Sequence, residues 1–187
     1  AAPQRTLVIG GQVERGRRIR LRPAFVLTAR PAVPEGGGPY RLEGLGRDGQ
    51  RLFAYGFDPA RLDHASDVRH FTFAIPIAQA SDALLREIRV SGPEGEDRLG
   101  QLEPRRAAEA QPAPVAPLAV AARGGDGLVT VTCTAGAQGA LVLDGPDGAI
   151  LGMASGPTVR IVAPPASPLT VVCSGGVHSV RTAVVAP

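Results

Sequence analysis

The chain has 187 residues and a formal net charge of +3, and all 20 of its basic residues are arginine. Because it lacks lysine, it cannot carry a phosphate-binding-loop lysine, a Schiff-base lysine or the catalytic lysine of a kinase. No apolar run approaches the roughly 20 residues of a transmembrane helix, and the slight excess of arginine over acid is too small for a nucleic-acid-binding surface.

Glycine and proline are abundant while aromatic residues are scarce, a mixture that favours many short strands joined by tight turns. A proline-rich stretch, Gln111–Pro117, follows a charged, alanine-rich lead-in. Proline fixes φ and keeps the preceding residue extended, so this stretch is expected to be a stiff connector. The sequence therefore predicts an all-β chain with a β-sandwich module over 1–105, a Pro/Ala-rich linker over 106–117 and a second β-sandwich module over 118–187.

The first predicted module shows alternating apolar and polar residues in regular succession. Gly10 and Gly11 predict a bulge or a close approach of the backbone inside its first strand, and Asp48-Gly49 predicts a hairpin turn. Ser81 is expected to cap one helical turn over 81–85. The expected strands are Thr6–Glu14, Arg18–Arg22 continuing in phase to Leu27, Tyr40–Leu45, Gln50–Phe57, His70–Ile77, Glu87–Ser91 and Arg98–Leu102.

The second predicted module repeats this pattern in almost uncharged residues, with glycine- and proline-rich turns between the strands. The expected strands are Leu118–Ala122, Leu128–Thr134, Ala140–Leu143, Ala149–Met153, Thr158–Val162, Leu169–Cys173 and Val177–Val185.

The two cysteines, Cys133 and Cys173, lie on the apolar faces of an early and a late strand of the second module. They point into the same core, as the inter-sheet disulfide of an immunoglobulin-like sandwich does, although the usual core tryptophan is missing. The alternative is two buried free thiols that behave as small hydrophobic groups. We favour the disulfide, which would make a small core viable outside the cell.

Several short motifs carry a resemblance to a known class of protein. The second half contains the stretch Leu169-Thr-Val-Val-Cys-Ser-Gly-Gly-Val177. Through this stretch it resembles the immunoglobulin-like C-terminal modules of large secreted bacterial, metallopeptidase-like proteins. In those modules a strand leads into the motif Ser-Asp-Gly-Val, and here Gly175 takes the position of the Asp. The first half is similar to the module that precedes it in such tails, through Leu7-Val-Ile-Gly-Gly11, Gly38-Pro-Tyr-Arg-Leu42, Asp48-Gly-Gln-Arg-Leu52, Phe57-Asp-Pro59 and Phe71-Thr-Phe-Ala-Ile-Pro76. The resemblance implies two tandem sandwiches and a secreted context, and it implies no catalytic residue.

The densest group of metal-ligand residues lies in one inter-strand loop. Asp58, Asp63 and Asp67 are weak candidates for a calcium site, because carboxylates in a flexible loop suit that cation. Their spacing matches no EF-hand, and nearby arginines can neutralise them, so we expect a solvated loop and no metal or other cofactor. His64 and His70 are weaker still as zinc ligands, since no third ligand has suitable spacing.

The densest basic run lies near the amino terminus. Arg18, Arg20 and Arg22 would form a one-sided stripe on a strand, a candidate site for a sulfated glycan, an anionic envelope polymer or an acidic partner surface. The alternative, which we favour, is an edge strand protected by charge or by cross-strand pairing with acids such as Glu43 or Glu87.

The function expected from these features is that of a non-catalytic accessory pair of modules in an exported bacterial protein, a spacer, folding aid or docking appendage for another domain or subunit. The partner could be the upstream part of the same precursor, and no nucleic acid is expected. Two alternatives remain. The chain could be a stand-alone surface or periplasmic module that binds carbohydrate or an anionic polymer, or the C-terminal part of a secreted metallopeptidase with its catalytic domain upstream.

Overall fold

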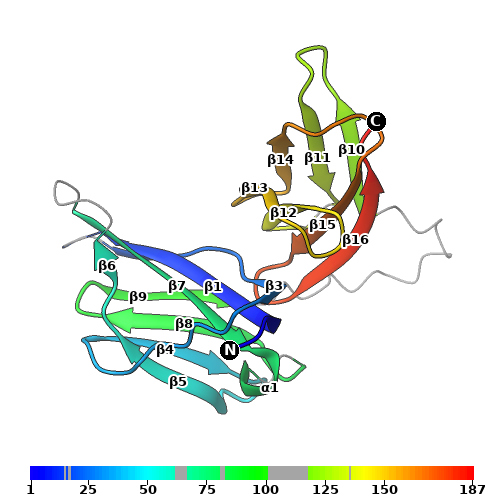
Figure 1. Ribbon diagram of the computed structural model, residues 1–187. Coiled ribbons are helices and arrows are strands. Elements are labelled where there is room, and N and C mark those ends of the chain that lie inside the picture. Colours follow the sequence, from blue (N-terminus) through cyan, green and yellow to red (C-terminus); the bar gives the residue numbers. More distant parts are fainter. Residues whose placement is uncertain (15, 17, 62–66, 81–82, 101–117, 135) are drawn as a thin grey trace, which may run out of the picture. The chain divides into compact units, whose positions relative to one another are not determined.

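A computed structural model describes residues 1–14, 16, 18–61, 67–80, 83–100, 118–134 and 136–187 (Figure 1). Within these ranges the protein is built of antiparallel β-strands, with one helix of a single turn. The chain divides into two compact units, residues 1–101 and 102–187. The predicted linker over 106–117 lies outside the described residues, so the arrangement of two tandem modules around a linker stays a prediction.

The first unit contains two antiparallel sheets. One has the order β2-β1-β7-β6, with β3 also paired to β1, and the other has the order β5-β4-β8-β9. Their elements are β1 (Gln4–Glu14), β2 (Arg18–Leu21), β3 (Phe25–Ala29), β4 (Tyr40–Leu45), β5 (Arg51–Phe57), β6 (Ala60–Arg61), β7 (Val68–Pro76), α1 (Ile77–Ala80), β8 (Glu87–Gly92) and β9 (Gly95–Gly100).

Buried apolar side chains of the first unit lie between its two sheets, an arrangement consistent with a β-sandwich. Leu7 and Ile9 of β1 and Leu42 of β4 are completely buried. The ring of Phe57, at the end of β5, lies 5.0 Å from Phe71 and 5.1 Å from Phe73 between ring centroids. Since both partners belong to β7, aromatic contacts join the two sheets directly.

Gly11 of β1 confirms the predicted close approach of the backbone. A Cβ atom at this position would lie 2.4 Å from the ring of Phe71 and 2.5 Å from the carbonyl oxygen of Arg20. The register between β1 and β7 runs through Gly10 and Gly11 without a shift, so the alternative expectation of a bulge is wrong here. At this point β1 stops pairing with β3 and begins to pair with β2, which makes the glycine pair the corner of the sheet.

Two local predictions for the first unit need correction. A helical turn is expected from the sequence over 81–85, but the described residues 83–85 are not helical. The observed helix, α1, ends earlier, at Ala80, and Ser81 lies outside the described residues. The helix begins at Ile77 because β7 ends at Pro76, which has no N–H to continue a ladder. The strand expected over Arg98–Leu102 begins earlier, at Gly95, so β8 and β9 form a tight hairpin with Gly92 opposite Gly95.

The second unit also contains two antiparallel sheets, and its seven strands follow the predicted ones to within one or two residues at most ends. One sheet has the order β10-β11-β14 and the other β13-β12-β15-β16. The strands are β10 (Ala119–Arg123), β11 (Val129–Cys133), β12 (Gly139–Asp144), β13 (Ile150–Ala154), β14 (Thr158–Ile161), β15 (Pro168–Ser174) and β16 (Ser179–Val185).

A disulfide joins the two sheets of the second unit. Cys133 on β11 is bonded to Cys173 on β15, with Cα atoms 5.8 Å apart, so the predicted disulfide is confirmed and the alternative of free thiols is wrong. Around it lies a core made only of small and medium-sized side chains, such as Val131, Val142 and Val171.

Arg123, at the end of β10, ties three backbone segments of the second unit together. Its guanidinium donates to the carbonyl oxygens of Gly127 at 3.0 Å, Ala163 at 2.8 Å and Pro187 at 2.7 Å. Gly127 lies between β10 and β11, Ala163 follows β14, and Pro187 follows β16, so one side chain holds three separate backbone segments together.

Candidate functional site

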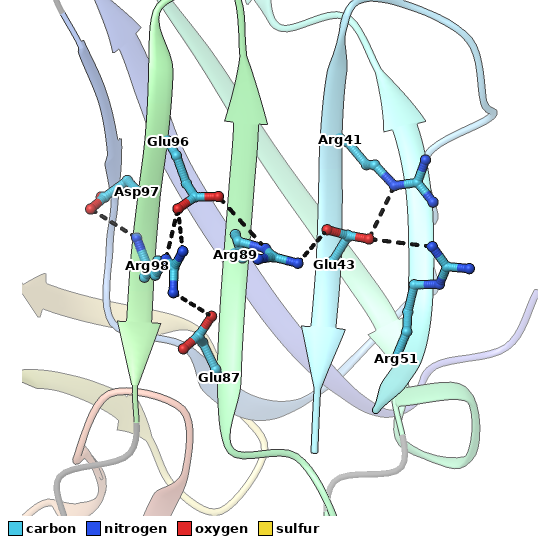
Figure 2. Close-up of polar contacts among 8 residues, drawn as sticks. All are labelled: Arg41, Glu43, Arg51, Glu87, Arg89, Glu96, Asp97 and Arg98. Carbon is cyan, nitrogen blue, oxygen red and sulfur yellow. Dashed lines mark hydrogen bonds and ion pairs between the residues drawn. The ribbon is translucent and has the colours of Figure 1, made fainter. Parts of the chain in front are cut away.

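A network of charged side chains lies on the outer face of the sheet β5-β4-β8-β9. Along β4, Tyr40 and Leu42 point into the core, so the alternate residues Arg41 and Glu43 point away from it. The same alternation on the neighbouring strands assembles a set of four arginines and three glutamates that we call the charged face (Figure 2): Arg41, Glu43, Arg51, Glu87, Arg89, Glu96 and Arg98.

Glu43 is the centre of the charged face. Its Oε2 accepts a hydrogen bond from Arg89 Nη2 at 3.0 Å across the β4–β8 pair. Its Oε1 accepts one from Arg41 Nε at 3.1 Å and lies 3.6 Å from Arg51 Nη1. Three guanidinium groups therefore surround one carboxylate, which is only 8% exposed.

The surroundings of Glu43 keep it ionised. Burial alone would raise the pKa of this carboxyl group, but the hydrogen bond and charge of Arg89, helped by Arg41, outweigh burial and hold the pKa below its usual value of 4.5. The negative charge in the middle of the face is therefore permanent at neutral pH.

The charged face continues across β8 and β9 as a chain of ion pairs (Figure 2). Arg89 Nε lies 3.8 Å from Glu96 Oε2, and Arg98 Nη2 lies 2.6 Å from Glu96 Oε1. Arg98 Nη1 also lies 3.9 Å from Glu87 Oε1. Each arginine on this side is thus placed between two acids, whereas Arg41 and Arg51 share one.

A second polar cluster, Tyr40–Arg69–Glu94, joins the two sheets of the first unit. The Tyr40 hydroxyl donates to Glu94 and accepts from Arg69 Nη2 at 2.5 Å, and Arg69 Nη2 also donates to Glu94 Oε1 at 3.2 Å. Burial and the hydrogen bond to Glu94 raise the pKa of Tyr40 to about 12. The hydroxyl therefore stays protonated, and the cluster serves to connect β4, β7 and the β8–β9 turn. A Cβ atom on Gly92 would lie 2.3 Å from the Tyr40 ring, so this position requires glycine.

The predicted arginine stripe lies where the sequence placed it. Arg18 and Arg20 are exposed on β2 with Ile19 buried between them, and Arg22 is exposed just beyond the strand. The expected pairing of this stripe with Glu43 or Glu87 is wrong, because those acids belong to the charged face on another sheet. The ion pair that involves the stripe joins Arg20 Nε to Glu14 Oε1 at 3.9 Å, across the β1–β2 ladder.

The acidic loop is described only in part. Asp58 lies 3.5 Å from Arg69 Nη1 as an ion pair, Asp67 is exposed, and Asp63 and His64 fall outside the described residues. Among the residues that the structure describes, no group of three or more His, Cys, Asp or Glu side chains is placed to hold a metal ion. The weak calcium assignment stays untested.

Sequence reasoning missed the charged face, although a signal for it was present. Charges of opposite sign stand two residues apart on three strands, as Arg41 and Glu43, then Glu87 and Arg89, then Glu96 and Arg98. Residues two apart on a strand share a face. Which strands become neighbours is not visible in this spacing, so the cross-strand pairs could not be assigned.

No protein-family model, curated protein or solved structure matches this chain. The resemblance to tandem modules of secreted bacterial proteins therefore stays a prediction. Among the described helices there is none of the length and apolar character needed to cross a membrane.

Replacing Glu43 by glutamine should destabilise the first unit by about 1–3 kcal/mol at pH 7, because three arginines lose their shared anion. Its folded-state pKa is depressed, so the stabilisation by Glu43 is present above the unfolded-state value and is lost as the pH falls through the folded-state value. The gap between wild type and E43Q should therefore shrink as the pH falls below 4.5.

Urea titrations followed by tyrosine fluorescence measure this effect in the first unit alone, because both tyrosines, Tyr40 and Tyr55, lie there. A gap between the two proteins that does not change with pH would contradict the role given to Glu43.

Proposed function

We propose that the chain is a non-catalytic accessory part of an exported protein, where it serves as a spacer, folding aid or docking appendage for another domain or subunit. The observation that carries this proposal is the disulfide between Cys133 and Cys173, which joins β11 to β15. Structural disulfides persist in oxidising compartments and are rare in the cytosol. The same argument supports an extracellular, cell-surface or periplasmic location.

The immunoglobulin-like character of the second unit belongs to this proposal. The disulfide joins its second and sixth strands, counted from β10, and these belong to different sheets. This is the strand placement of the inter-sheet disulfide in immunoglobulin domains. Such domains are common as structural modules of secreted and surface proteins, which supports an accessory role.

The charged face gives further support to a structural role for the first unit. Glu43, Arg89, Glu96 and Arg98 are engaged with one another at the distances given above. Their charges stabilise the strand pairs of one sheet, as cross-strand pairs of opposite charge do in general.

The test is to isolate the native gene product from its source cell and to determine its mass, its compartment and its thiol content. We expect an exported polypeptide well above the 19.2 kDa of this chain, with Cys133 and Cys173 unavailable to alkylation under denaturing, non-reducing conditions. A cytosolic product with both thiols free would sink the proposal. A protease domain in the same polypeptide would instead favour the C-terminal part of a secreted metallopeptidase.

A second candidate function is binding of an anionic polymer or carbohydrate by a stand-alone module. The observation that favours it is the exposure of Arg18 and Arg20 on β2 and of Arg22 directly after it. Multiple arginines in a row can pair with sulfate or carboxylate groups.

Binding through this stripe predicts retention on a heparin column that is lost in R18Q/R20Q/R22Q. The triple variant R5Q/R30Q/R47Q is a matched control, because it removes the same charge from other exposed positions. Equal elution of the two variants, or no retention of the wild type, would refute the stripe as a binding site.

A further inference from the structure

The strand β5 lies at one end of the sheet β5-β4-β8-β9, and among the described strands it pairs with β4 alone. A terminal strand has N–H and C=O groups that point away from the sheet and can pair with another extended chain. Arg51–Phe57 therefore offers a template of seven residues for strand addition.

The opposite end of the same sheet is covered. Asp97 on β9 accepts a hydrogen bond through Oδ2 from the backbone N–H of Leu21 on β2, at 2.6 Å. The strand β2 thus lies against β9, while no such contact with a described strand is found on the far side of β5. Within the described part of the chain, β2 covers the β9 end of this sheet, whereas no strand pairs with the outer edge of β5.

Positive charge gathers at the open end. The guanidinium of Arg41 extends over β5, and that of Arg51 reaches to the outer side of β5 (Figure 2). The side chains of both are more than half exposed, at 52% and 57%. Among the described residues, Glu43 is the one acid that pairs with either of them.

Glu43 engages Arg41 more closely than Arg51. Its Oε2 is engaged by Arg89 at 3.0 Å, and its Oε1 accepts from Arg41 Nε at 3.1 Å. Arg51 Nη1 is left 3.6 Å from the same oxygen, beyond a good hydrogen bond. Because each guanidinium has five N–H donors, most of the donors of Arg41 and Arg51 remain available to an incoming anion.

We propose that an extended acidic peptide segment of a partner adds to β5 as a further strand, with carboxylates that reach Arg51 and Arg41. Backbone pairing would supply affinity and the two arginines would select acidic side chains, as in other cases of strand addition. This inference gives a partner chemistry to the docking role proposed above and in that respect rests on it.

The local geometry suits such a strand. An added strand would lie about 4.8 Å from β5, and its alternate residues would project on the same side as the charged face. On that side β5 carries Ala54 opposite Glu43 and Gly56 opposite Arg41. The small side chain of Ala54 leaves room above the middle of β5 for the arginine side chains and for carboxylates from a neighbouring strand. Nearer the end of β5 the backbone of Gly37 covers this side, because a Cβ atom on Gly56 would lie 3.0 Å from the Gly37 carbonyl oxygen.

The experiment uses the full chain and a synthetic capped peptide, as long as β5, in which glutamate and valine alternate. Binding is measured by calorimetry, and amide hydrogen exchange locates it. We expect slower exchange over Arg51–Phe57, loss of binding to the same peptide with glutamine in place of glutamate, and loss of binding when the peptide amides are N-methylated at alternate positions. Both N-methylation registers are tested, because either edge of the peptide could face β5.

The decisive variant is R41Q/R51Q, and the control is R98Q. Arg98 lies on the same face and its side chain is similarly exposed, at 54%, but it pairs with two acids, Glu87 and Glu96. We expect R41Q/R51Q to weaken peptide binding about tenfold and R98Q to weaken it less than twofold. Circular dichroism confirms that each variant is folded.

Three results would overturn the inference. They are no binding of the acidic peptide, binding that is insensitive to N-methylation, and equal loss in R41Q/R51Q and R98Q. Retention of heparin without binding of the peptide would show a general polyanion surface in place of a strand-addition site. The native mass measurement is independent, so failure of the peptide experiment leaves the accessory role standing.

Discussion

The bond between Cys133 and Cys173 is the constraint on which the second unit depends. All seven aromatic residues of the chain, counting Phe and Tyr, lie before residue 74. The core of the second unit is therefore built from Ala, Val, Leu, Ile and the two half-cystines. Small side chains bury little area each, and a short domain of this kind gains little from its core alone. A covalent link between the sheets compensates for this weak core, because it lowers the conformational entropy of the unfolded chain.

The first unit holds its two sheets together by different means. Phe57 contacts Phe71 and Phe73 across the interior, and Tyr40, Arg69 and Glu94 close one end of the interface with hydrogen bonds. Charges on its outer face are arranged around Glu43 and Glu96, and they pair across the neighbouring strands β4, β8 and β9. Arg41 and Arg51, beside β5, share Glu43 with Arg89, and their side chains remain more than half exposed.

The strands could be predicted from the sequence because alternation is a local signal, and the disulfide could be predicted because Cys133 and Cys173 alternate in phase with buried valines. The charged face and the Tyr40 cluster could not, since Glu43 and Arg89 are 46 residues apart and meet only through the order of the strands. The helical turn was misplaced by a few residues because Ser81 looks like a cap, while the observed turn follows from the end of β7 at Pro76. The predicted pairing of the arginine stripe with Glu43 or Glu87 is wrong for a related reason. Which sheet a strand belongs to depends on contacts between residues far apart in the sequence, and the local pattern does not show them.

The most direct test of this account compares the oxidised protein with the same chain refolded in reductant, by hydrogen exchange resolved along the sequence. For a disulfide that spans 40 residues, the loss in stability of the second unit should be about 3–4 kcal/mol. Amides of β11 and β15 should then exchange far faster, while tyrosine fluorescence should report an unchanged transition for the first unit. Equal protection of β11 and β15 in the two forms would contradict the claim that this bond replaces an aromatic core.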